Sequence, residues 1–180
     1  MKNNLLIFFI FIFLSSFVNA EDLLIQSKVI NIDKKKETTI FEDEVTITTS
    51  ENNIIKSEYA EYNKKTGIII LKKDIEVTDN QNNKFKSNYA IYNEKLKTLS
   101  SIGNTEIITS ENYIINSSDI VFDDLKKYIA SDKKTVIIDQ DNNRIVLDNF
   151  EYLISDFIFK SVGNIKVEDN LNNTYNFSQV

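Results

Sequence analysis

Adjacent carboxylates are the side chains of this chain best suited to catalysis. Asp43-Glu44 and Asp123-Asp124 are two such pairs, and paired carboxylates can act as general acid and base in glycoside hydrolysis. Both pairs fall at expected turns, where we expect them to face water. The chain has 0 His and no Cys, so it lacks the commonest general base and the usual zinc ligands. We therefore expect no enzyme, no catalytic residue and no metal or cofactor.

An acidic run at 139–143 superficially resembles a calcium loop. An EF-hand requires a glycine at the sharp turn and a bidentate glutamate at its last position. Arg144 and Phe150 stand at those two positions. The run is therefore not expected to bind calcium as an EF-hand does.

The main feature that would position any site is a repeat of 30 residues. One column consists of asparagines: Asn52, Asn82, Asn112, Asn142 and Asn172. Another column is nearly all aromatic: Ile32, Tyr62, Tyr92, Phe122 and Tyr152. Gapless repeats of this kind indicate one supersecondary unit that stacks on its neighbours and buries a continuous core.

Each unit predicts two strands joined by a tight turn. Apolar and polar residues alternate in segments such as 45–48 and 75–78, which is typical of half-buried strands. The asparagines tolerate left-handed backbone and can form the turn. A second strand is expected around the column Ile55, Phe85, Ile115, Ile145 and Tyr175, with Ser57, Ser87 and Ser117 two residues further on.

The apolar phase changes after the serine column, which predicts a bulge or bend. The next residues expected to be buried are Ile30, Ala60, Ala90, Ile120 and Phe150, followed by the aromatic column. The strand should then break at Asp33, Asn63, Asn93 or Asp123. With only Gly67, Gly103 and Gly163 available for corners, a parallel β-helix is disfavoured. The predicted fold is all-β, a folded-over antiparallel β-jelly roll of about five such repeats.

The first 20 residues are treated separately from the fold. Lys2 precedes an apolar run and the segment closes on Ala20, which is typical of a cleaved secretory signal. An uncleaved membrane anchor is the alternative. Residues 21–180 form the predicted domain, and the formal net charge of −6 argues against nucleic acid as a partner.

The repeat resembles the OstA-like, or LptA-like, family. The segment 87–93, Ser-Asn-Tyr-Ala-Ile-Tyr-Asn, is similar to the first half of the family's repeat, and the segment 162–167, Val-Gly-Asn-Ile-Lys-Val, to the second half. The resemblance covers essentially all of 21–180. It implies a folded-over jelly roll, open at one side, in the periplasm of a Gram-negative cell.

The same resemblance implies transport of lipopolysaccharide from the inner to the outer membrane, with partners of the same fold that join by edge-strand addition. The candidate edges are 21–32 and 172–180, and a homo-oligomer is possible. An apolar inner face could hold acyl chains, although each inward residue taken singly could simply be core. The candidate groove residues are Ile47, Ile55, Tyr62, Val77, Phe85, Tyr92, Ile107, Ile115, Phe122, Ile137, Ile145 and Tyr152.

Three other interpretations stay open at this point. The chain could be the amino-terminal periplasmic domain of a longer LptD-like outer-membrane assembly protein, because it stops partway into a further repeat. It could be a membrane-anchored component resembling LptC. It could also be a carbohydrate-active or adhesive β-repeat, which would require a solvent-exposed row of aromatic and acidic residues.

Overall fold

The computed structural model describes residues 23–154, 156 and 158–180. This part of the chain is all-β, with 17 strands, as the alternating apolar pattern predicts. The expected signal segment, 1–20, lies outside the described residues. Within the described ranges we find no helix that is long and apolar enough to cross a membrane.

The first six strands include the longest ones. They are β1 (Leu24–Gln26), β2 (Val29–Asp33), β3 (Thr38–Thr48), β4 (Ile54–Asn63), β5 (Ile68–Thr78) and β6 (Lys84–Asn93). The later strands are shorter. They are β7 (Thr98–Ser101), β8 (Asn104–Ile108), β9 (Ile114–Ser118), β10 (Val121–Asp123), β11 (Tyr128–Ser131), β12 (Thr135–Ile138), β13 (Arg144–Leu147), β14 (Phe150–Leu153), β15 (Ile158–Lys160), β16 (Val162–Glu168) and β17 (Thr174–Gln179).

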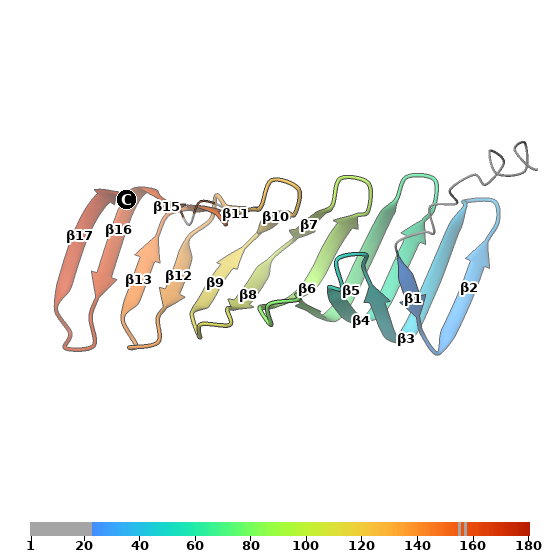
Figure 1. Ribbon diagram of the computed structural model, residues 1–180, viewed down its shortest axis with the longest axis horizontal. Helices are drawn as coiled ribbons and strands as arrows, with labels where there is room; N and C mark the ends of the chain where they lie inside the picture. Colours follow the sequence, from blue (N-terminus) through green and yellow to red (C-terminus); the bar gives the residue numbers. More distant parts are fainter. Residues whose placement is uncertain (1–22, 155, 157) are drawn as a thin grey trace, which may run out of the picture.

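All strand pairs are antiparallel, and they form one sheet that folds over into two layers. The asparagine layer runs from β1 through the second half of β3, the first half of β4, the second half of β5 and the first half of β6 to β8, β9, β12, β13, β16 and β17. The lysine layer runs from β2 through the other halves of β3 to β6 and on to β7, β10, β11, β14 and β15. Figure 1 shows the strands side by side along the long axis, with β1 and β2 at one end and β17 at the other.

The predicted bend lies directly after the serine column. Between β3 and β4 the pairing passes from Glu42↔Tyr59 to Val45↔Ser57, so two residues of β3 stand opposite one of β4. The same shift occurs between β5 and its two neighbours. This is a β-bulge, which bends the strand and changes which side chains face inward. The bulges therefore explain why the apolar phase changes in the sequence.

The asparagine turns join the strands as predicted. They cover 49–53, 79–83, 109–113, 139–143 and 169–173, and the fourth residue of each is an asparagine with φ between 63° and 66°. The first residue is a threonine or aspartate that accepts a hydrogen bond from the backbone N–H four positions on, at 3.2 Å for Thr49 and 2.8 Å for Asp79. Asparagine tolerates left-handed backbone better than most residues.

The lysine turns join the strands at the ends opposite the asparagine turns, so that the bend lies between the two kinds of turn. We use this name for 33–37, 63–67, 93–97 and 123–127, each of which starts with an aspartate or asparagine. That first side chain accepts backbone N–H groups of its own turn, as Asn93 does from Lys95 and Leu96, both at 3.0 Å. Neighbouring lysine turns are also joined, because the Glu94 N–H donates to the Gly67 carbonyl at 2.8 Å.

The core lies between the two layers and receives residues from both. Ile47 and Ile75 enter from the asparagine layer, and Ile69 and Leu71 enter from the lysine layer, with at most 1% of each exposed. The predicted column Ala60, Ala90, Ile120 and Phe150 is buried. Ile30 and Ile32 were expected in the same phase, but they are 54% and 69% exposed. They lie in β2, at the end of the lysine layer, where β3 is the only partner of β2 among the described strands.

The serine column has a structural role that the sequence did not explain. Ser57 and Ser87 are buried at the bend, and each donates to the carbonyl of the tyrosine two residues on, at 3.1 and 3.2 Å. Ser117 shares a hydrogen bond of 2.8 Å with Thr135. Bulges interrupt the ladder of backbone hydrogen bonds, and an unpaired buried carbonyl is costly. These hydroxyls line the closed side of the fold with satisfied polar groups.

Candidate functional site

All twelve candidate groove residues belong to the interior cluster. Six are buried: Ile47, Ile55, Phe85, Tyr92, Ile107 and Ile137. Six are half-buried and pack against that core: Tyr62, Val77, Ile115, Phe122, Ile145 and Tyr152. Each of the twelve lies within two residues of a turn, so together they line the side of the interior that lies opposite the bend. We call this side the mouth.

The interior changes in character from the bend to the mouth. Hydroxyls such as Ser57 and Thr135 line the bend, and aliphatic side chains such as Ile75 and Leu71 fill the middle. Around the mouth the side chains are larger, half of the candidates are half-buried, and five of the twelve are aromatic. The middle is filled by the protein's own side chains. A guest molecule would therefore enter by separating the layers at the mouth, where packing is least complete.

A charged contact joins the two layers at the mouth. The Lys97 Nζ atom lies 3.1 Å from the Ser50 hydroxyl and 3.4 Å from a Glu51 carboxylate oxygen. The Lys97 side chain is only 19% exposed and that of Glu51 33%. This contact, which we call the clasp, joins an asparagine turn to a lysine turn. It was not predicted, because its partners lie 47 residues apart, about one and a half repeats.

Tyr92 lies close to the clasp and belongs to the buried core, with 7% of its surface exposed. Burial, and then the nearby carboxylates of Glu51, Glu94 and Asp124, raise the pKa of its hydroxyl. The phenol therefore stays neutral at physiological pH. The clasp therefore lies near an uncharged aromatic side chain, that of Tyr92.

Both ends of the molecule present strand edges with exposed apolar side chains. At one end Leu24 of β1 is 58% exposed and Ile32 of β2 is 69% exposed. At the other end Tyr175 and Phe177 of β17 are 47% and 53% exposed. β1 pairs only with β3, and β17 only with β16, among the described strands. The edges expected from the sequence are therefore present at both ends.

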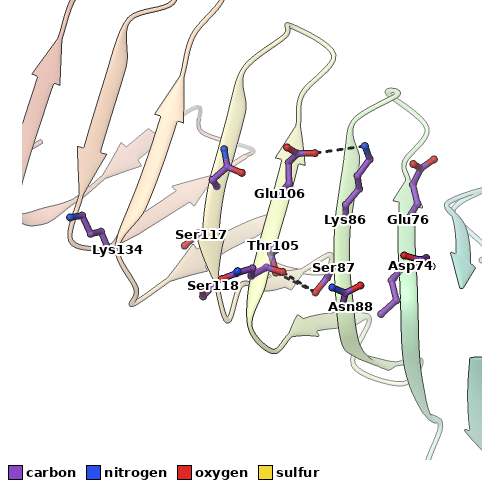
Figure 2. Close-up of a pocket in the computed structure, with 13 residues that line it drawn as sticks. Asp74, Glu76, Lys86, Ser87, Asn88, Thr105, Glu106, Ser117, Ser118 and Lys134 are labelled. Carbon is purple, nitrogen blue, oxygen red and sulfur yellow. Dashed lines mark hydrogen bonds and ion pairs between the residues drawn. The ribbon is translucent and has the colours of Figure 1, made fainter.

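A polar depression of about 720 Å³ lies on the outer face of the asparagine layer, close to the bend (Figure 2). Two of its carboxylates already have lysine partners, because Lys86 lies 3.7 Å from Glu106 and Lys84 lies 3.9 Å from Glu76. Its lining is Asp74, Ile75, Glu76, Lys86, Ser87, Asn88, Asn104, Thr105, Glu106, Asn116, Ser117, Ser118 and Lys134. The depression has no aromatic side chain and is separate from the mouth.

The carboxylate pairs considered for catalysis do not form a site. Asp43 and Glu44 are exposed at the first bulge, and the Glu44 carboxylate pairs with Lys28 at 2.5 Å. Asp123 caps its own lysine turn, and the backbone N–H of Lys126 holds the pKa of its carboxyl below the ordinary value. In the described part of the chain, no three potential metal ligands come together.

Comparisons with known proteins add little to this geometry. No family model matches the chain, and no curated protein matches it in sequence. A solved structure of LptH from Pseudomonas aeruginosa, the LptA-homologous periplasmic component of a lipopolysaccharide transport device, is 9% identical. The match covers 79% of this chain and 86% of that one, with a TM-score of 0.31.

A second solved structure, the TCP10 domain of CPAP from Danio rerio in complex with a STIL peptide, is 8% identical. It covers 87% of this chain and 99% of that one, with a TM-score of 0.17. Both TM-scores are too low for either structure to carry an argument about this chain. The candidate function therefore depends on the repeat, the interior and the edges.

Proposed function

We propose that this chain is an exported, non-enzymatic carrier that shields the acyl chains of lipopolysaccharide between its two layers, in the periplasm. The observation that carries the proposal is the continuous apolar interior, which is sealed by bulges along one side and only half-buried at Tyr62, Val77, Ile115, Phe122, Ile145 and Tyr152 along the other. The resemblance of the repeat to the OstA-like family supports the same function.

The energetics favour a sheltered route for such a lipid. Burying a CH₂ group is worth about 0.8 kcal/mol, so an acyl chain of about a dozen carbons would lose roughly 10 kcal/mol on entering water. A carrier must therefore offer apolar contact over an extended length. The interior offers such contact because every described repeat contributes inward Ile, Val, Leu, Tyr or Phe side chains.

The open edges support a role in a chain of similar domains. Unpaired strand edges are templates for strand addition by another polypeptide. Here the edges β1, β2 and β17 combine unpaired backbone with exposed Leu24, Ile32 and Phe177. Joining two such domains end to end would make their interiors continuous. A second copy, or another Lpt-type jelly-roll protein, is the partner that this geometry suits.

Photo-crosslinking of the purified protein to lipopolysaccharide tests this proposal. A photoreactive residue at Val77 or Ile107, which face inward, should crosslink to the lipid. Glu76 and Glu106 are the matched controls, because each is the adjacent residue on the same strand and lines the outer depression. Binding of lipopolysaccharide should also be saturable. The proposal fails if no saturable binding occurs, or if outward and inward positions crosslink equally.

A further inference from the structure

The two rows of turns that border the mouth carry opposite charges. The four lysine turns contain nine lysines and five carboxylates. The five asparagine turns contain six carboxylates and neither lysine nor arginine. An amphipathic molecule held in the interior would place its head group between these rows, so an anionic head group would be attracted to the lysine turns.

Most lysines of the lysine turns with a described ion pair are neutralised within their own layer. Lys126 lies 3.1 Å from Asp123 of the same turn, and Lys127 pairs with Asp124. Lys65 lies 3.8 Å from Glu37 of the neighbouring lysine turn. These pairs would survive a separation of the two layers.

Lys97 differs because its carboxylate partner belongs to the opposite layer. Separation of the layers at the mouth would move Glu51 away and leave the Lys97 ammonium close to Tyr92 without its counter-charge. A half-buried charge that loses its partner is costly, and that cost is removed if an anion takes the partner's place. Opening the mouth is therefore coupled to the arrival of an anion.

We propose that Lys97 is the head-group site of the groove, and that an anionic, phosphate-bearing lipid head group replaces Glu51 there when the layers separate. Lysine binds phosphate as a point charge, and a phosphate carries more charge than the single carboxylate of Glu51. The acyl chains of the same molecule would lie beside Tyr92 and Phe122. This inference rests on the proposed function and assigns a recognition residue to it.

Two lipids with the same acyl chains test the proposal: lipid A with its phosphates and lipid A from which they have been removed. Lys97→Gln should weaken binding of the phosphorylated lipid by about tenfold, which is the size of one lost charge-assisted hydrogen bond. Binding of the dephosphorylated lipid should change by less than about twofold. Lys86→Gln, which removes a lysine from the outer face, is the matched control and should leave both affinities unchanged.

Glu51→Gln is the second variant, and it distinguishes head-group binding from a purely structural role of the clasp. It removes the internal competitor for Lys97, so it should strengthen binding of the phosphorylated lipid severalfold. If the clasp served only stability, both variants would alter the binding of both lipids to the same extent, and that result would overturn the proposal. An absence of any effect from both variants would overturn it as well.

Two further results separate this proposal from others. If neither lipid binds the unmodified protein, the carrier function itself is wrong. If the dephosphorylated lipid binds as tightly as the phosphorylated one, only the head-group site is wrong. Inorganic phosphate at matched concentration should not displace the lipid, and a Lys97-dependent affinity for inorganic phosphate alone would show a free-anion site and overturn the proposal.

Discussion

The first and second halves of the molecule build the same repeat in two ways. β3 to β6 run through the bend without a break for 10 or 11 residues each. From residue 98 onward the strands are interrupted at the bend and none is longer than 7 residues. The mouth shows the same difference in weaker form. In the first half four candidate residues are buried and two, Tyr62 and Val77, are half-buried; in the second half two, Ile107 and Ile137, are buried and four are half-buried.

The bend residues explain part of this difference. In the first half two consecutive residues, Asp43 and Glu44 or Lys73 and Asp74, adopt positive φ and form a bulge that keeps the ladder continuous. In the second half Gly103 and Gly163 occupy the corresponding positions, with φ of 83° and 117°. A continuous strand holds the two layers at a fixed angle, whereas an interrupted strand constrains that angle less. The second half is therefore the region where we expect the layers to separate.

The largest expected difference between the halves concerns the core. Ile55→Ala removes a buried side chain from a continuous strand, in the same repeat column as Ile145, and should lower the free energy of unfolding by about 3 kcal/mol. Ile145→Ala removes a half-buried side chain beside the mouth and should cost about 1 kcal/mol. Urea denaturation measures both. Equal losses would contradict the idea that the second half is packed less completely.

A smaller effect is expected from the two bend glycines. A Cβ at residue 163 would lie 2.8 Å from the Asp148 carboxylate, whereas one at residue 103 meets nothing within 4 Å. Gly163→Ala should therefore cost about 2 kcal/mol, from strain and a clash together. Gly103→Ala should cost about 1 kcal/mol, from the positive φ alone. Thermal denaturation of both variants checks the order, and a more damaging Gly103→Ala would contradict it.

The smallest expected effect is on the pH dependence of the asparagine turns. Hydrogen bonds from Asn143 and Asn173 lower the pKa of Asp139 and Asp169. Because the folded pKa lies below the unfolded value of about 3.9, these carboxylates stabilise the fold above that value, and the contribution disappears as pH falls through the lowered folded pKa. Thr49 starts the first such turn and cannot titrate in this way.

Urea midpoints at neutral pH and near pH 3 measure this effect. The unmodified protein should lose more stability on acidification than a variant carrying Asp139→Asn and Asp169→Asn. An identical loss in the two proteins would show that these turns do not contribute to acid sensitivity. The comparison between halves would then rest on the core and the bends alone.

Local features of the fold were predictable from the sequence because they depend on neighbouring residues. The left-handed asparagines and the bulge after the serines follow from backbone preference and from a change of apolar phase. Exposure at the ends was not predictable in the same way, because Ile30 matches the buried column in type and register but lies in the terminal described strand of its layer. The clasp between Glu51 and Lys97 depends on how the two layers cross, and periodicity contains no information about that.

The distance between the two layers at the mouth, measured with and without lipopolysaccharide, tests the central claim most directly. The chain contains no cysteine, so spin labels can be placed cleanly at Ser50 with Leu96 for pulsed electron resonance. A second pair, Asn80 with Lys126, occupies the same two positions one repeat further along the chain. Saturating lipid should lengthen both distances. Unchanged distances at saturating lipid would contradict the claim that acyl chains enter between the layers.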